Sequence, residues 1–427
     1  MNYEKQLIVN ERTGEKYYYI KHPTGLSIYV MEMEGYNTAF ALFGTKYGSV
    51  NTTFKTKNDA DFVTVPEGIA HFLEHKLFEN EDCDVFELYA KTGASGNAYT
   101  SFGRTAYLFS CTENFPESLS ILLDFVQKPY FTQATVDKEQ GIIAQEIKMG
   151  EDNPYVAVFF NLLKAVYHSH PVRIGIAGTV DSIAKINADL LYRCYYTFYN
   201  LNNMVLSVAG NCRVDDVLEV ADRLLKPCED AGLECVFPNE PDTVVQSEYK
   251  CSMPVGVPLF AIGFKAKPCI GAEMIKKEFE SAFLMDLIFG STTKFYQDCL
   301  RAGLINSSFE SETLDGDGYF VNLLEGESND PEKFRAMVNE EIARVKREGL
   351  DRSEFESLKK SRYASAIRAF GSAESCASLM LNAHMTQSKP FDSIEILASI
   401  TYEDVAGALD ELLNAENSSI SIVEPLK

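Results

Sequence analysis

The sequence has no apolar run as long as the roughly 18–20 residues that a membrane-spanning helix needs. Its N-terminal segment, MNYEKQLIVNERTGEKYYYI, is charged and shows no apolar stretch followed by a small-residue cleavage site. These two absences argue against a membrane protein and against a secretory signal. We therefore expect a cytoplasmic protein.

The ten cysteines include no CxxC pair and no short framework spacing. Scattered cysteines of this kind are typical of reduced, mostly buried thiols, and they argue against a disulfide scaffold or a cysteine zinc site. The sequence also lacks a phosphate-binding GxxxxGK[ST] motif and any low-complexity segment.

Basic residues are few relative to acidic ones, with 39 Lys and Arg against 62 Asp and Glu, and the net charge is −23. A surface that binds nucleic acid needs a basic stripe to neutralise phosphates, so this balance argues against a nucleic-acid partner. An acidic surface attracts cationic peptides, but it also commonly serves solubility alone. Both interpretations stay open.

The length of 427 residues and the 46% hydrophobic content suffice for two or more domains. Strand-like segments in the first half, TAFALFGTKYGS and the closing MVLSVAGN, have counterparts in the second half, VPLFAIGFKAKP and SSISIVEP. This similarity predicts a duplicated α+β unit. We expect a zinc-binding domain at 1–225, a Pro-, Gly- and acid-rich linker at 226–248, and a homologous domain at 249–427.

The segment GIAHFLEHKLFEN places two of the six histidines four residues apart. On a helix, His71, Glu74 and His75 project from one face. Pro66 and Glu67 suit the first turn of that helix. Two imidazoles with one carboxylate are a common ligand set of catalytic zinc, whose fourth position holds water. Glu74 is too close along the helix to be the expected third ligand, but it can take a proton from that water.

The segment VDKEQGIIAQEIKMGEDNP offers Glu139 and Glu146, which lie two helical turns apart on one face. Ile142, Ile143 and Ile147 would then pack on the core side. Two carboxylates on a half-buried face are costly unless they are paired or bind a metal. An ordinary solvated acidic face is the alternative for this pair.

The remaining histidines are weaker candidates. His168 and His170 are rival metal ligands, but residues two apart cannot share a helical face, and a proline follows them directly. His22 and His384 are isolated in the sequence, and we interpret them as structural.

The order of HxxEH, a strand with an asparagine, and a later glutamate pair resembles the inverted-zincin peptidases, which include pitrilysin, insulin-degrading enzyme and the mitochondrial processing peptidase. The resemblance covers most of the chain and includes SGNAYTS, KEQGIIAQE, HPVRIGIAGTVDSI and YNLNNMVLSVAGN. It is strongest to cytoplasmic bacterial members of about this length that work as paired subunits. It implies an α+β fold of two homologous domains, each a mainly antiparallel sheet packed with helices, that face each other as a clamshell.

The resemblance implies a role for each site residue. His71 and His75 would bind zinc together with Glu146. Glu74 would be the general base that activates zinc-bound water, and Glu139 would orient a ligand or support activity. The enclosed chamber of the family implies short or unfolded peptides as substrates.

In the family, the strand after the metal helix is an open edge that binds substrate as an added β-strand. This implies main-chain contacts around Asn97, Ala98, Tyr99 and Thr100, with the Asn97 side chain reaching the substrate. The residues alone indicate only a turn that leads into a strand.

One segment departs from the family pattern. A C-terminal stretch resembling LREKxGLAY supplies an arginine and a tyrosine that bind substrate and stabilise the tetrahedral intermediate. Here the matching stretch is FYQDCLRAGLINSSF, in which Gly303 and Leu304 align but Asn306 stands at the tyrosine position. The arginine aligns with Leu300 or, after a one-residue gap is shifted, with Arg301.

We therefore expect a zinc-dependent endopeptidase that forms a dimer, either of identical chains or with a homologous subunit. The first alternative is a zinc-bearing subunit that is active only with a homologue supplying the Arg/Tyr pair. A non-catalytic assembly subunit is the second. The third is a metal-regulated binding module, which would retain His71 and His75 but tolerate loss of Glu74.

Overall fold

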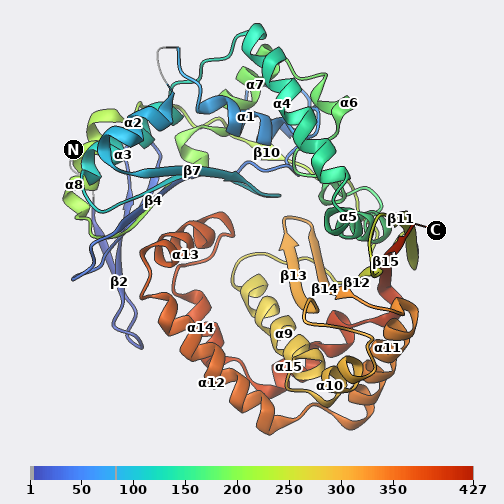
Figure 1. The fold of residues 1–427 in the computed structure, drawn as a ribbon. Coiled ribbons are helices and arrows are strands. Elements are labelled where there is room, and N and C mark those ends of the chain that lie inside the picture. Colours follow the sequence, from blue (N-terminus) through green and yellow to red (C-terminus); the bar gives the residue numbers. More distant parts are fainter. Residues whose placement is uncertain (1–3, 82–83, 427) are drawn as a thin grey trace. The chain divides into compact units, whose positions relative to one another are not determined.

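The computed structural model describes residues 4–81 and 84–426, and the chain forms two compact units (Figure 1). Unit 1 consists of Met1–Ile147, Gly175–Val236 and Ala366–Phe391. Unit 2 consists of Lys148–Ile174, Phe237–Ser365 and Asp392–Lys427.

The described part of unit 1 contains a seven-stranded sheet in the order β1-β2-β3-β9-β4-β8-β7. Strands β3 and β9 are parallel, and every other neighbouring pair is antiparallel. The central strands β4 and β9 are buried at every position because both of their faces are covered. The strands are β1 Gln6–Val9, β2 Lys16–Lys21, β3 Ser27–Glu32, β4 Ala39–Thr45, β7 Ser95–Thr100, β8 Thr105–Cys111 and β9 Met204–Gly210.

Unit 1 also contains a small sheet in the order β10-β5-β6. Its strands are β5 Thr53–Lys55 and β6 Val63–Thr64, which precede the helix that carries His71 and His75, and β10 Glu234–Cys235. The helices that lie wholly in unit 1 are α1 Ile69–Leu77, α2 Val85–Thr92, α3 Phe115–Val126, α6 Val180–Ile183, α7 Ala188–Phe198, α8 Val214–Leu224 and α13 Ala373–Met385. Helix α4, Gln133–Glu151, belongs to unit 1 as far as Ile147.

Unit 2 contains a five-stranded sheet in the order β11-β15-β12-β14-β13. Its strands are β11 Glu248–Met253, β12 Leu259–Lys265, β13 Glu310–Gly316, β14 Tyr319–Glu327 and β15 Ser418–Pro425. Its helices are α5 Pro154–Val166, α9 Ala272–Phe289, α10 Lys294–Arg301, α11 Pro331–Glu348, α14 Asp392–Ser399 and α15 Tyr402–Leu412, while α12, Arg352–Ala369, passes from unit 2 into unit 1.

The two sheets repeat one topology. In unit 1 the order β3-β9-β4-β8-β7 has one parallel pair followed by three antiparallel pairs. In unit 2 the order β11-β15-β12-β14-β13 has the same sequence of pairings. The predicted duplication of a mainly antiparallel α+β unit is therefore confirmed.

Each sheet is packed against a helix from the other half of the sequence. Helix α13 contacts β9, β4 and β3 in unit 1, and helix α5 contacts β15, β12 and β11 in unit 2 (Figure 1). Both helices bury apolar residues against their sheet, among them Leu381 on α13 and Leu162 on α5. The compact units therefore do not follow contiguous stretches of the chain.

Two local expectations from the sequence are wrong. Helix α1 does not include Pro66 and Glu67, because it begins at Ile69 after Gly68, whose φ of 87° lies in the left-handed region. Ile142 does not pack in the core and is 48% exposed, whereas Ile143 is fully buried. Consecutive residues of a helix point about 100° apart, and of these two only Ile143 points into the core.

The described cysteines are free thiols, and those that are buried are Cys111, Cys194, Cys212, Cys299 and Cys376. Cys83, one of the ten in the sequence, lies outside the described residues. In the part of the chain that the structure describes, no helix has the length and apolar character needed to cross a membrane.

Candidate metal centre

The start of the metal helix is fixed by a close contact between two loops. A Cβ on Gly68 would lie 2.3 Å from the carbonyl oxygen of Ala177, and a Cβ on Gly178 would lie 2.5 Å from that of Glu67. The Ser182 hydroxyl also donates a hydrogen bond of 2.9 Å to the Glu67 carbonyl. The GIAGTVDS segment therefore serves to hold the first turn of α1. Sequence reasoning missed this role, although the glycine in GIAGT marked the close approach.

Helix α1 has one core face and one polar face. Ile69, Phe72 and Leu73 are buried in the hydrophobic core of unit 1. The His71 and His75 rings lie on the other side with their centroids 4.5 Å apart. This division follows from the helical period, which separates the i, i+4 histidines from the intervening apolar residues.

Helix α4 brings both predicted glutamates to this polar face. Glu146 Oε1 lies 3.5 Å from Nε2 of His71, and Glu146 Oε2 lies 3.7 Å from Nε2 of His75. Glu139 is 6% exposed, and its Oε1 lies 2.9 Å from Nδ1 of His75. The hydrogen bond with His75 lowers the pKa of the Glu139 carboxyl against the opposing effect of its burial.

The donor set fits a zinc ion. One ligand atom from each of His71, His75 and Glu146 lies within 4.8 Å of the other two. Ligand atoms around a tetrahedral zinc with bonds of about 2.0–2.1 Å lie roughly 3.3–3.5 Å apart, close to the two measured separations. Burial, and then the charge of His75, lowers the pKa of His71 to about 4, which keeps its imidazole neutral at neutral pH. A neutral imidazole has the lone pair that a metal needs.

Glu74 lies beside these groups without joining the set of three. The Thr100 hydroxyl donates a hydrogen bond of 2.5 Å to its Oε2. Burial raises the pKa of the Glu74 carboxyl, while the bond from Thr100 opposes this effect. A carboxylate with a raised pKa next to a metal site is suited to act as a general base.

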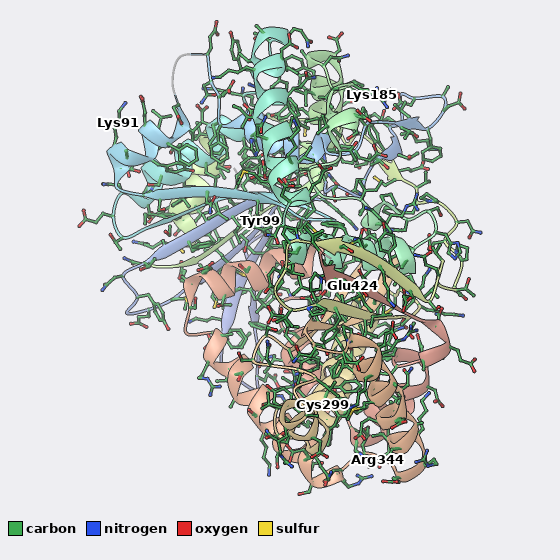
Figure 2. The ribbon with its side chains drawn as sticks, turned by 45° about the vertical axis from the view of Figure 1, so that its right-hand side comes forward. Lys91, Tyr99, Lys185, Cys299, Arg344 and Glu424 are labelled. Atoms are coloured by element: carbon green, nitrogen blue, oxygen red, sulfur yellow. The ribbon has the colours of Figure 1, made fainter. Side chains whose placement is uncertain are left out.

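Strand β7 ends the seven-stranded sheet, so among the described strands it pairs with β8 alone. Side chains alternate along a strand, and Ala98 and Thr100 therefore point to the face that carries α1, while Asn97 and Tyr99 point to the opposite face. Figure 2 labels Tyr99 among the side chains of the chain. The Asn97 side chain accepts a hydrogen bond of 2.9 Å from the backbone N–H of Ala98. The family resemblance placed all four residues on one edge strand but did not separate the two faces.

Comparisons with known proteins show the family of this chain. Residues 65–180 match the family model described as Insulinase (Peptidase family M16), and residues 185–362 match the model described as Peptidase M16 inactive domain. A Bacillus subtilis protein named as the zinc protease YmfH is 36% identical over 420 residues, which span 97% of this chain and 98% of that protein. The chain belongs to peptidase family M16.

Other M16 proteins extend the comparison. A crystal structure of an M16-like peptidase from Alicyclobacillus acidocaldarius is 32% identical, has a TM-score of 0.91, and is covered over 99% of its length by the whole of this chain. The mitochondrial-processing peptidase subunit beta of Bos taurus is 31% identical over 159 residues, 36% of this chain and 32% of that protein. The name of the Bacillus subtilis relative supports a zinc peptidase, and the predicted family is confirmed.

The other histidines of this M16 chain have structural partners. None of them belongs to the cluster of His71, His75 and Glu146 in the described residues. Their ring nitrogens contact protein atoms as follows: His22 Nε2 with Asp222 at 3.0 Å, His168 Nε2 with the Thr243 carbonyl at 3.1 Å, His170 Nε2 with the Asp317 carbonyl at 3.0 Å, and His384 Nδ1 with the Tyr29 hydroxyl at 3.3 Å.

The segment FYQDCLRAGLINSSF covers most of α10 and the turn before β13. Asn306 donates a hydrogen bond of 2.7 Å to Glu327 and accepts hydrogen bonds from the backbone and side chain of Ser308. Arg301 has a side chain that is 72% exposed and lies 3.3 Å from Asp298. The Asn306 side chain therefore stabilises the turn before β13.

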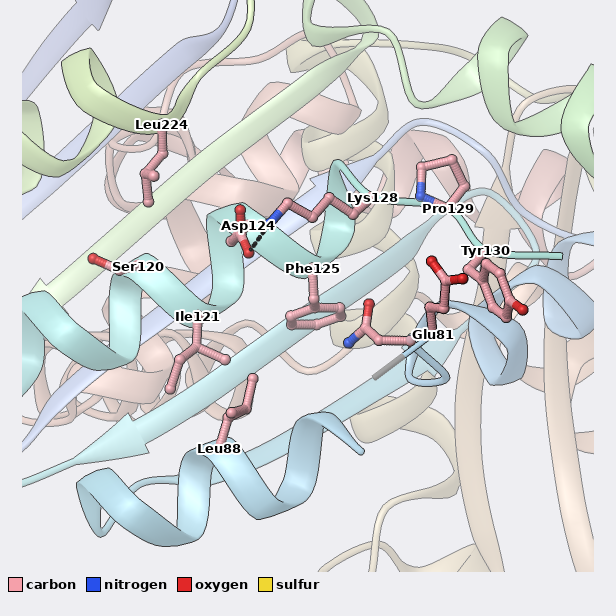
Figure 3. Close-up of a pocket in the computed structure, with 11 residues that line it drawn as sticks. Glu81, Leu88, Ser120, Ile121, Asp124, Phe125, Lys128, Pro129, Tyr130 and Leu224 are labelled. Carbon is pink, nitrogen blue, oxygen red and sulfur yellow. Dashed lines mark hydrogen bonds and ion pairs between the residues drawn. The ribbon is translucent and has the colours of Figure 1, made fainter. Parts of the chain in front are cut away.

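A cavity of about 590 Å³ lies elsewhere in unit 1, among α2, α3 and the end of α8 (Figure 3). Apolar side chains such as Leu88 and Phe125 line it, together with the Lys128–Asp124 ion pair of 2.6 Å. None of the predicted zinc-binding or substrate-binding residues lines this cavity.

Proposed function

We propose that the chain is a zinc-dependent endopeptidase that hydrolyses short or unfolded peptides. The observation that carries this proposal is the convergence of His71, His75 and Glu146 within 4.8 Å, with Glu139 bonded to His75. Glu74 is next to this cluster and is not one of its three donors. This is the arrangement that metal-assisted hydrolysis requires, namely an open donor set with an adjacent base.

Zinc would be held by His71, His75 and Glu146. When bound, the metal supplies Lewis acidity, which lowers the pKa of a water ligand and polarises the substrate carbonyl. Glu74 accepts the proton of the attacking water and then donates it to the departing amine. Glu139 holds the Nδ1–H of His75, so that the Nε2 lone pair points toward the metal position.

The open edge of β7 supports an extended peptide as the substrate. A peptide that adds as a strand to this edge would bond to the main chain around Asn97, Ala98, Tyr99 and Thr100. The Asn97 side chain would release the Ala98 N–H on binding and then reach the substrate. Short or unfolded chains adopt an extended strand without first unfolding, which is why we propose them as the substrates.

The zinc content and the peptide hydrolysis of the isolated chain test this proposal. We expect about one zinc per chain and hydrolysis of a fluorogenic unstructured peptide that stops with a chelator and returns with zinc. Glu74→Gln should keep the zinc but lower kcat by about 10²- to 10⁴-fold, the usual contribution of a general base. Glu87→Gln, an exposed carboxylate on α2, is the matched control. Loss of zinc in Glu74→Gln would overturn the assignment of Glu74 as the base.

Asn306 favours a second candidate function, a zinc-bearing subunit of a heterodimer. It stands where the family places a tyrosine, and its amide is held by Glu327 and Ser308. Under this alternative the isolated chain takes up zinc but cleaves peptide only after a homologous subunit with the Arg/Tyr pair is added. A chain that cleaves fully without a homologue would rule it out.

A further inference from the structure

We propose that Thr100 is a positioning residue whose hydroxyl fixes the carboxylate of Glu74. This inference rests on the proposed function, in which Glu74 is the base. It differs from the substrate contact expected of Thr100, because that contact uses the main chain and this one uses the side chain.

The hydrogen bond between the two residues is short and has one direction. Thr100 Oγ1 lies 2.5 Å from Glu74 Oε2, at the short end of the range for a hydroxyl that donates to a carboxylate. An ionised carboxylate can only accept, so Thr100 is the donor. Among the residues that the structure describes, no other side chain or backbone group donates a hydrogen bond to Glu74.

The neighbouring tyrosine hydroxyls make no hydrogen bond to Glu74 among the described residues. Tyr107 and Tyr199 lie close enough to Glu74 that its charge adds to the effect of burial in raising the pKa of both hydroxyls. These hydroxyls bond to each other at 2.9 Å in the buried core. Among the described side chains, Thr100 is therefore the hydrogen-bond donor to Glu74.

The sheet fixes the position of Thr100 itself. Thr100 pairs with Thr105 across β7 and β8, and the two hydroxyl oxygens are 3.3 Å apart. Thr105 is fully buried and donates its own hydrogen to the Tyr47 carbonyl at 2.9 Å. Backbone pairing fixes the face to which the Thr100 side chain points, and β-branching limits the rotamers open to its hydroxyl.

Through Thr100, the strand that would bind the substrate is connected to Glu74, the proposed general base. The main chain of Thr100 lies on the edge strand that an added peptide would extend, while its side chain restrains one oxygen of Glu74. The other oxygen remains free to take the proton of the attacking water. Because Thr100 would contact both the bound peptide and Glu74, the register of the peptide on β7 would also set the distance between the peptide carbonyl and the Glu74 carboxylate.

Three variants test the proposal, each loaded with zinc and assayed with the fluorogenic peptide. Thr100→Val keeps the shape and removes the hydroxyl, and Thr100→Ser restores it. Thr53→Val is the matched control, since Thr53 lies on β5 and bonds to Thr64 at an exposed position. The absorption spectrum of the cobalt(II)-loaded protein provides a readout without substrate.

We expect Thr100→Val to retain one metal per chain and a KM within about twofold of wild type. Its kcat should fall about 10- to 100-fold, because the Glu74 carboxylate is no longer held in position by a hydrogen bond. Its cobalt spectrum should change, because a freed Glu74 alters the surroundings of the metal and its water. Thr100→Ser should restore kcat and the spectrum, and Thr53→Val should alter neither.

Other outcomes would contradict the proposed role of Thr100 or the proposed function, and they can be told apart. An unchanged kcat and cobalt spectrum in Thr100→Val would overturn the proposal, and so would a Thr100→Ser variant as impaired as Thr100→Val. A raised KM at constant kcat would show that the side chain binds substrate instead. If the wild-type chain cleaves nothing, the proposed function fails for the isolated chain, and the cobalt spectra alone decide the role of Thr100.

Discussion

Nδ1 of His75 lies 2.9 Å from Glu139, and this contact leaves Nε2 of the same ring directed toward Glu146 at 3.7 Å. A carboxylate that holds one ring nitrogen sets the tautomer and the orientation of the imidazole, and thus makes the other nitrogen a ligand. The two glutamates of α4 therefore contact different nitrogens of His75, although both lie on one helical face.

Glu146→Gln should weaken zinc binding strongly, because an amide oxygen carries no charge with which to balance the metal. The measurement is zinc affinity in a competition titration with a chelator. Glu151→Gln, an exposed position at the end of the same helix, is the control. An affinity equal to that of the control would exclude Glu146 as a ligand.

Glu139→Gln should affect the rate more than metal occupancy. The amide can still accept a hydrogen bond from His75, but it loses the charge that supports the ring. We expect kcat to fall by about 10- to 100-fold with close to one zinc retained per chain. Metal analysis and steady-state kinetics on the same sample distinguish the two effects. Zinc loss as severe as in Glu146→Gln would contradict the proposed division of roles between the two glutamates.

Gly68→Ala should destabilise unit 1 and weaken zinc binding. The position has a φ of 87°, and a Cβ would lie 2.3 Å from the Ala177 carbonyl oxygen. Gly14→Ala is the matched control, since Gly14 has a similar φ of 78° but open space around it. The backbone strain alone costs about 1–3 kcal/mol, so Gly68→Ala should exceed the control in urea unfolding. Equal losses would show that the contact with Ala177 has little effect.

Acid should weaken unit 2 through Glu240. Burial alone would raise the pKa of this carboxyl, but hydrogen bonds from Lys265 and from the backbone N–H groups of His168, Ser169 and His170 lower it to about 2. A depressed folded-state pKa stabilises the fold above the unfolded value of 4.5 and loses that contribution as the pH falls toward 2.

Glu240→Gln tests this dependence. The variant should be less stable near neutral pH, and its free energy of unfolding should fall less steeply than that of wild type from about pH 5 to about pH 3. Urea unfolding at several pH values measures both effects. Parallel slopes for the two proteins would assign the acid sensitivity to other carboxylates.

Asn306→Ala should cost little activity, because the family tyrosine is already absent from this position. The lost hydrogen bonds to Glu327 and Ser308 should reduce stability by about 0.5–1.5 kcal/mol each at most. Peptide hydrolysis and thermal unfolding of the same preparation measure the two quantities. A collapse of activity with an intact fold would show that this turn contributes to catalysis.

The short-range part of the site was predictable. His71, Glu74 and His75 share a face because the helical period is a local property, and this remains true in any fold. The strands of the duplicated unit were also predictable, since alternating and wholly apolar segments recur in both halves of the chain. Side-chain type and spacing alone suffice for such features.

The sequence by itself determined the polar face of α1, the glutamate pair of α4 and the repeated strands, all of which follow from local periodicity. Only the tertiary structure decided that Glu139 meets Nδ1 of His75, that Thr100 points at Glu74, and that α5 and α13 each pack on the sheet of the other half. These contacts join residues far apart in the chain, and no local pattern specifies which buried surface an amphipathic helix or an edge strand will meet.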